Sequence, residues 1–189
     1  MLSKERYQTA TGPDWVYLSM DVGRVSERLM GMQDEVWLRH ANPWSVWSRV
    51  LTPLPSLALS IWGRASIGNG AWGAVVIVLV WIWLNPRVFA QPKTFNSWSS
   101  QGVLGERVWL RHRDKVAGHH KSVANALAIG SGLGLFPFAY GLLTYNPGLT
   151  CLGIVVISGG KMWFVDRMVW IWRDFEHMGG SLEDLTTPH

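Results

Sequence analysis

The chain has 189 residues, enough for one domain with a sizeable core. Thirteen are tryptophan, where a soluble protein of this length carries roughly two or three, and such an excess fits surfaces that are half apolar and half wet, such as a membrane interface. The net charge is +4 without a nucleic-acid-binding motif, and the single cysteine, Cys151, excludes an internal disulfide framework. The composition therefore favours a membrane protein with a lipid bilayer, and no nucleic acid, as its partner.

A polar arm, residues 1–26, precedes the first regular pattern. From Glu27 onward, apolar side chains recur near the 3.6-residue period of a helix: Leu29, Met30, Met32, Val36 and Trp37. Asn42-Pro43 then breaks the pattern. We expect an amphipathic helix lying on the bilayer surface, although a helix packed on a soluble core fits the periodicity equally well.

Two apolar stretches follow, residues 44–62 and 71–84, joined by a glycine-rich turn. Pro53 and Pro55 lie inside the first stretch and should kink it or split it. The second has no polar side chain apart from its indole N–H groups, and Asn85-Pro86-Arg87 stops it. Because a spanning helix needs about 20 residues, this second span reaches the required length only with its flanks.

The second half of the chain follows the same order with longer segments. A helix is expected over residues 98–115, and two apolar stretches follow at residues 122–145 and 149–165, joined by a tight turn. Gly130 and Gly134 form a GxxxG pattern, which permits close contact between helices.

An internal repeat relates the two halves. Val-Trp-Leu-Arg-His occurs at residues 36–40 and again at 108–112, and Val-Trp-Ile-Trp occurs at 80–83 and 169–172. Two matched landmarks in the same order favour a duplication, with an insertion in the second copy. The predicted parts are the arm 1–26, a first unit 27–90, a second unit 91–176 and a polar tail 177–189.

Basic residues concentrate in the connection between the halves: Arg87, Lys93, Arg107, Arg111, Arg113, Lys115 and Lys121. By the positive-inside rule this connection is cytoplasmic. We expect an all-α integral protein of the inner (cytoplasmic) membrane with four spanning helices and both termini cytoplasmic. The spans form two parallel-repeat hairpins, each preceded by an interfacial amphipathic helix. A soluble helical protein is the alternative, because proline breaks the first stretch and the second is short.

Four short motifs lie at residues 39–49 (RHANPWSVWSR), 83–87 (WLNPR), 105–109 (GERVW) and 163–167 (WFVDR). Together they resemble an uncharacterised family of small Trp-rich bacterial and archaeal membrane proteins, classed as a domain of unknown function. The resemblance covers most of the chain after about residue 30. It implies a membrane location and supplies neither an activity nor a catalytic residue.

Four side chains on the predicted cytoplasmic side are candidate metal ligands: His40, Glu106, His112 and His119. If the two units surround a pseudo-twofold axis, their histidines and carboxylates converge, a set that suits zinc or non-haem iron. The six-residue spacing of Glu106 and His112 puts them on different faces of a helix, so one helix cannot supply a chelate. The structural alternative is that polar residues gather on this side because the outer turns are small.

Four charged residues lie within or beside the predicted spans: Arg49, Lys161, Asp166 and Arg167. Intramembrane charges are costly and indicate a functional site by default. The alternative is structural, with Lys161 reaching the interface along its apolar stem and Asp166 pairing with one of the three cations.

The sequence holds no nucleophile elbow, Walker loop or dinucleotide fingerprint. It favours a non-catalytic accessory or scaffold subunit that packs against other membrane protein subunits or a second copy. The alternative is a membrane enzyme whose His and carboxylate groups, with or without a metal, act on a lipid-like substrate at the cytoplasmic face. A small carrier is disfavoured by the lack of polar residues along the spans.

Overall fold

The computed structural model describes residues 34–186, and over this range the protein is all-α. The predicted arm 1–26, the first turns of the predicted amphipathic helix and residues 187–189 lie outside the described residues. The elements are α2 Asp34–His40, α3 Pro43–Leu51, α4 Pro53–Ile67, η1 Gly68–Gly70, α5 Ala71–Val88, α6 Trp98–Arg111, η2 Arg113–Lys115, α7 Gly118–Leu133, α8 Leu135–Leu143, α9 Pro147–His177 and α10 Leu182–Thr186.

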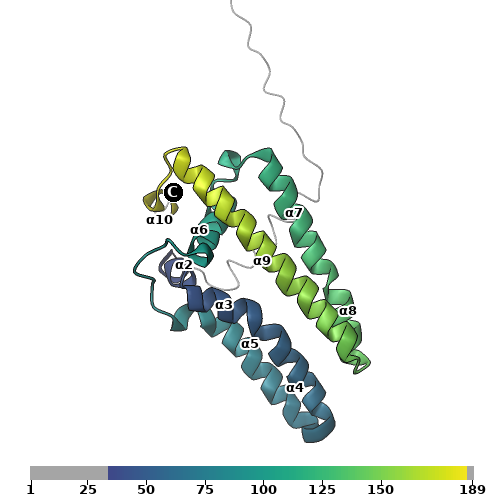
Figure 1. Cartoon of the computed structure of the whole chain (residues 1–189). Coiled ribbons are helices and arrows are strands. Elements are labelled where there is room, and N and C mark those ends of the chain that lie inside the picture. The colour runs from purple at the N-terminus through teal and green to yellow at the C-terminus, as the bar shows by residue number, and fades with distance from the viewer. Residues whose placement is uncertain (1–33, 187–189) are drawn as a thin grey trace, which may run out of the picture.

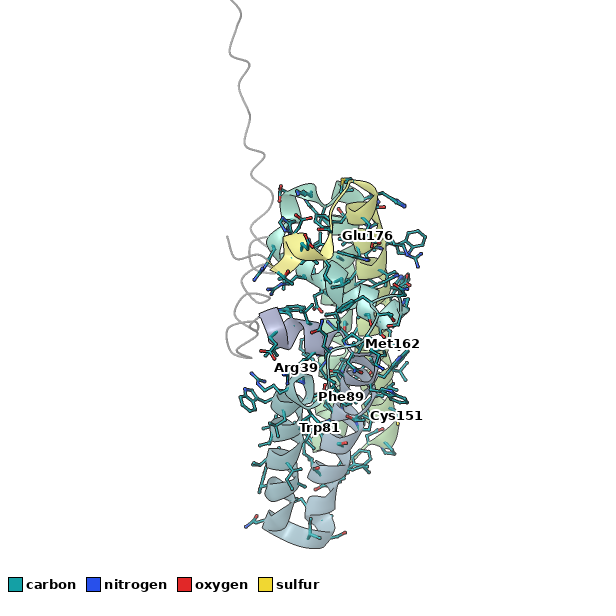
Figure 2. All side chains as sticks on the ribbon, turned by 90° about the vertical axis from the view of Figure 1, so that its left-hand side faces the viewer. Arg39, Trp81, Phe89, Cys151, Met162 and Glu176 are labelled. Carbon is teal, nitrogen blue, oxygen red and sulfur yellow. The ribbon has the colours of Figure 1, made fainter. Side chains whose placement is uncertain are left out.

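Three helical runs are long and apolar enough to cross a membrane: Pro43–Val88, Gly118–Leu143 and Pro147–His177. Their most apolar windows are only 11%, 22% and 17% buried. Apolar helices of a water-soluble domain turn such faces inward, whereas here large apolar side chains such as Ile77, Leu79 and Val155 are exposed. Figure 2 draws the helices with their side chains. This outward apolar surface indicates a multi-pass membrane protein.

The first of these runs folds back on itself at Gly68–Gly70, so that α4 and α5 lie side by side (Figure 1). Gly68 adopts a φ of 56°, which only glycine reaches without strain. The predicted break at the prolines is confirmed, since α3 ends at Leu51 and Pro53 starts α4. Pro53 is tolerated there because the first residues of a helix need no intrahelical donor.

The predicted stop at Asn85-Pro86-Arg87 is wrong, because α5 continues through Pro86 to Val88. Near the end of a helix a proline removes few hydrogen bonds, and Arg87 Nη1 donates to the carbonyl oxygen of Trp83 at 2.5 Å. Asn85 is fully buried and bonded to α3, which holds this last turn in place.

In the second half, α7 and α8 pack along α9, which is one helix of 31 residues. At 1.5 Å per residue α9 is about 46 Å long, more than the roughly 30 Å hydrocarbon core of a bilayer. Its C-terminal part therefore extends beyond a span. We call the structure around that part the head; it comprises α6, η2, the first two turns of α7, α9 beyond Val165 and α10.

The head has the main buried core, and both hairpin turns lie at the opposite end of the molecule (Figure 1). The core residues are Leu104, Val108, Trp109, Val116, Ala124, Met168, Ile171, Trp172, Phe175 and Leu185. A smaller cluster of Trp37, Ala41, Val46 and Val103 joins α2 and α3 to α6. Most of α6 is buried by these contacts, so this helix packs inside the head.

Glycines allow the closest helix contacts. A Cβ on Gly105 would overlap the backbone carbonyl of Met168 in α9, and one on Gly102 would overlap the side chain of Val165. Of the predicted GxxxG pair, Gly134 faces α9, where a Cβ would lie 2.8 Å from the side chain of Ile157. Gly130 has no atom within 4 Å of its Cβ position, because it points away from α9, so the predicted motif does not make a helix contact as a pair.

Candidate functional site

We call the helices α3 to α5 the first hairpin. A pocket of about 420 Å³ lies between this hairpin, α6 and α9, and we call it the interhelical pocket. Its lining residues are His40, Val46, Arg49, Val50, Pro53, Leu54, Ile82, Val103, Glu106, Ile157, Ser158, Lys161 and Val165. Along α3 and α4 the lining residue nearer the head is Arg49 and the one farther from it is Leu54. Along α9, Lys161 is likewise nearer the head than Ile157. The pocket therefore has a charged end near the head and an apolar end among the spans.

The charged end contains two contacts between helices. The guanidinium of Arg49 contacts the imidazole of His40, and Lys161 Nζ lies 3.3 Å from Glu106 Oε1. Burial lowers the pKa of His40 well below the ordinary histidine range, and the nearby charges of Arg49 and Lys161 lower it further. His40 is therefore neutral at pH 7.

The structure brings two of the four predicted metal ligands, His40 and Glu106, to this pocket. His112 instead caps α6, stacks on Phe175 with ring centroids 5.5 Å apart, and has Nε2 3.3 Å from the carbonyl oxygen of Asp184.

His119 is exposed and lies against the ring of His120, with centroids 4.1 Å apart. Among residues 34–186, no three or more His, Cys, Asp or Glu side chains are placed to hold one metal ion. The zinc or iron site stays a prediction, and this geometry gives it no support.

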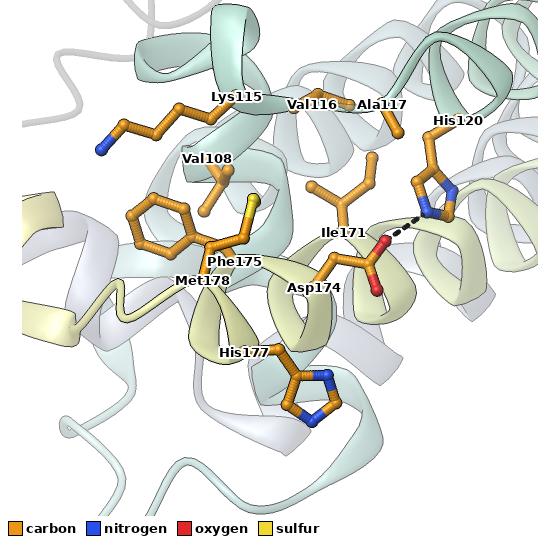
Figure 3. Close-up of a pocket in the computed structure, with 10 residues that line it drawn as sticks. All are labelled: Val108, Lys115, Val116, Ala117, His120, Ile171, Asp174, Phe175, His177 and Met178. Atoms are coloured by element: carbon orange, nitrogen blue, oxygen red, sulfur yellow. Dashed lines mark hydrogen bonds and ion pairs between the residues drawn. The ribbon is translucent and has the colours of Figure 1, made fainter.

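A second pocket, of about 250 Å³, lies in the head (Figure 3), and we call it the head pocket. Within it His120 Nε2 lies 2.9 Å from Asp174 Oδ2, and Arg167 Nη1 lies 3.4 Å from His120 Nδ1. Lys115 and His177 point away from this pair (Figure 3). Nε2 of His120 faces Asp174 and Nδ1 faces Arg167, so the imidazole of α7 lies between two side chains of α9. The arrangement suits a brace between α7 and α9.

Sequence reasoning missed the His120–Asp174 pair. The partners are 54 positions apart on helices whose relative rotation no local pattern records. In the structural alternative for the charges beside the spans, Asp166 pairs with Arg49, Lys161 or Arg167. Asp166 Oδ1 instead accepts a 2.9 Å hydrogen bond from Trp98 Nε1, because α6 starts beside α9 at this level.

The fold and its pockets define a small all-α membrane protein with a helical head. Residues 22–188 match a family of unknown function, DUF6653, and the chain belongs to that family. No curated protein and no solved structure matches the chain. The resemblance of the four short motifs to an uncharacterised family is thus confirmed at the level of a family of unknown function.

Proposed function

We propose that this protein is a non-catalytic accessory or scaffold subunit of a membrane complex, which connects partners within the bilayer to its cytoplasmic head. The observation that carries the proposal is α9, a single unbroken helix that runs from the apolar hairpin into the core of the head. A continuous helix transmits position between bilayer and cytoplasm without a hinge. In the head pocket, the contact of His120 with Asp174 joins α7 to α9 and supports a structural role for these groups.

The proposed topology has four spans: α3 with α4, then α5, then α7 with α8, then the first part of α9. The basic connection between α5 and α6 and the nearly uncharged turns support a cytoplasmic head and both termini inside an inner membrane. Exposed tryptophans at the head end of the spans support the same placement, since tryptophan favours the membrane interface: Trp44, Trp83 and Trp163.

The order of helices supports the proposed repeat of units 27–90 and 91–176. In each unit, Val-Trp-Leu-Arg-His lies at the end of a helix, α2 or α6. Two consecutive helices follow, α3 and α4 in the first unit and α7 and α8 in the second. A tight turn then leads to one unbroken helix, α5 or α9. The unbroken helix is longer in the second unit, as the predicted insertion requires.

Cysteine labelling tests the topology. In a Cys151→Ser background, a cysteine at Asn69 or Asn146 should react with an impermeant thiol reagent from outside the cell. A cysteine at Lys115 or Glu176, both exposed in the head, should react only after the membrane is opened. Labelling in the opposite order would overturn the topology.

Purification in a mild detergent, with metal analysis and mass measurement by light scattering, tests the accessory role. The expected result is a complex of defined stoichiometry, with further membrane subunits or a second copy, and no stoichiometric metal. The competing hypothesis, an enzyme with a His and carboxylate site at the cytoplasmic face, predicts a monomer with about one bound zinc or iron per chain. That outcome would replace the accessory role.

A further inference from the structure

The charges that line the interhelical pocket do not balance. Lys161 and Glu106 form a pair at 3.3 Å, while Arg49 lies against His40, which brings no negative charge. The described side chains at the charged end therefore carry a net charge of +1. A cation held in an apolar surrounding favours an anion beside it, because the Coulomb attraction is less screened than in water.

The rest of the pocket is apolar and lies among the spans. Below Arg49 and Lys161 the walls are formed mainly by aliphatic side chains: Val50, Leu54, Ile82 and Ile157. The volume of about 420 Å³ is within the range of sites for small organic ligands. One end therefore suits an anionic group and the other a hydrocarbon chain.

The level of the pocket favours a ligand from the bilayer. Lys161 is two residues before the exposed Trp163 on α9, and Arg49 is five residues after the exposed Trp44 on α3. Because exposed tryptophans sit at the headgroup level, the charged end lies at the depth of lipid phosphates and the apolar end at the depth of acyl chains. Basic pockets between spans on the cytoplasmic side are suited to anionic headgroups.

We propose that the interhelical pocket binds an anionic phospholipid, with its phosphate on Arg49 and Lys161 and one acyl chain along Leu54 and Ile157. Arginine suits the phosphate because its planar guanidinium donates two parallel hydrogen bonds, and lysine adds a point charge. Bound in this pocket, the lipid contacts the first hairpin on one side and α6 and α9 on the other. This site rests on the topology proposed above and does not depend on the accessory role.

The test uses the full chain, delipidated in a non-ionic detergent and titrated by native mass spectrometry. The probes are phosphatidylglycerol, phosphatidylcholine with the same acyl chains, and inorganic phosphate. Phosphatidylglycerol should bind at least tenfold more tightly than phosphatidylcholine, and inorganic phosphate at the same concentration should not displace it. Equal binding of the two lipids would overturn the proposal, and displacement by phosphate would assign the pocket to a free anion.

Substitutions locate the binding. Arg49→Gln and Lys161→Gln should each weaken phosphatidylglycerol binding about tenfold or more, and Arg49→Lys should recover part of the loss. Arg87→Gln is the matched control, because Arg87 is at the same end of the spans, lies over the ring of Trp83 and does not line the pocket. A loss in Arg87→Gln as large as in Arg49→Gln would show general surface attraction and overturn the site.

A third variant covers the case that a charge substitution disturbs folding. Ile82→Trp fills the apolar end from α5 and leaves every charge in place. It should lower phosphatidylglycerol binding about tenfold while circular dichroism keeps its helical signal. Unchanged lipid binding in this variant would overturn the placement of the acyl chain and with it the proposed site.

Discussion

At the scale of single residues, identical sequence acquires different surroundings. The two copies of Val-Trp-Leu-Arg-His end in His40 and His112. His40 is buried against Arg49 at the interhelical pocket, whereas His112 is half-buried and stacks on Phe175 in the head. Each surrounding is set by the helix that packs across it, so the chemistry of a repeated motif is decided by its neighbours.

His40 should make the stability of the fold depend on pH. Its pKa is lowered in the folded protein, so the unfolded chain binds a proton first as the pH falls below about 6.5. Stability is therefore complete above that pH and declines below it. The thermal midpoint in detergent, measured from pH 7.5 to 5.5, should fall less in His40→Gln than in the wild type. The exposed His119→Gln is the control, and equal pH slopes for wild type and His40→Gln would contradict this assignment.

Gly105→Ala should destabilise the protein strongly. The new Cβ would overlap the Met168 carbonyl, which is backbone and cannot rotate away, so α6 and α9 must separate. Overpacking of this kind costs about 1–3 kcal/mol, which thermal unfolding in detergent would record as a lower midpoint. Gly130→Ala is the control; its Cβ position is open, and removing a helical glycine stabilises by up to about 1 kcal/mol. A similar midpoint for the two variants would refute the close α6–α9 contact.

At the scale of elements, the first hairpin is held by a buried polar network between α3 and α5. Ser45 Oγ donates to Asn85 Oδ1 at 2.8 Å, and Asn85 Nδ2 donates to Ser48 Oγ at 2.7 Å. Asn42 adds a 2.8 Å bond from its amide to the carbonyl oxygen of Ala90. Because apolar surface gains little by leaving lipid, such bonds fix which faces of two helices meet.

A double-mutant cycle should detect this network. Ser45→Ala and Asn85→Ala each remove one partner of the same hydrogen bond and leave the other buried, so each should lower the free energy of unfolding. Their combination should cost less than the sum of the two, with a coupling energy of about 0.6–1.7 kcal/mol, as for hydrogen bonds between membrane helices. Unfolding in a denaturing detergent gives the four values, and strict additivity would mean that the bond contributes nothing.

At the scale of the whole molecule, the two halves are joined by one irregular connection and by contacts across α3, α6 and α9. Ser100 Oγ donates to the carbonyl oxygen of Ala41 at 2.7 Å, and the rings of Trp47 and Trp98 stack at 5.7 Å. These contacts are at the head end. Farther from the head, Ala58 of α4 packs against Phe138 and Leu142 of α8, so the two hairpins also contact each other directly.

Trypsin should cut the connection at the exposed Lys93 without separating the halves. With the proposed topology, inside-out vesicles are cut and right-side-out vesicles are protected. After cutting, the two fragments should co-elute in mild detergent, because the Ser100 and Trp98 contacts do not depend on the connection. Cleavage in right-side-out vesicles would reverse the topology, and separation of the fragments would show that the connection itself holds the halves together.

Several features could be predicted from sequence because their causes are local. A hydrocarbon surrounding demands an apolar run of sufficient length, so the regions of the long helices are visible along the chain. Turns are visible as well: Asn42 and Asn146 cap α3 and α9 with their side chains, accepting bonds from Trp44 N and Leu149 N, and each is followed by proline. These signals need only neighbours within a few positions.

Tertiary structure alone decided which distant groups meet. The pairs Lys161–Glu106, His120–Asp174 and Trp98–Asp166 join helices 54 to 68 positions apart, and the sequence assigned different partners to His112 and Asp166. The sequence likewise gave no indication that Gly105 contacts α9. The physical reason is that a partner depends on how far each helix rotates about its axis and where two helices cross, and the packing of all their facing side chains sets both.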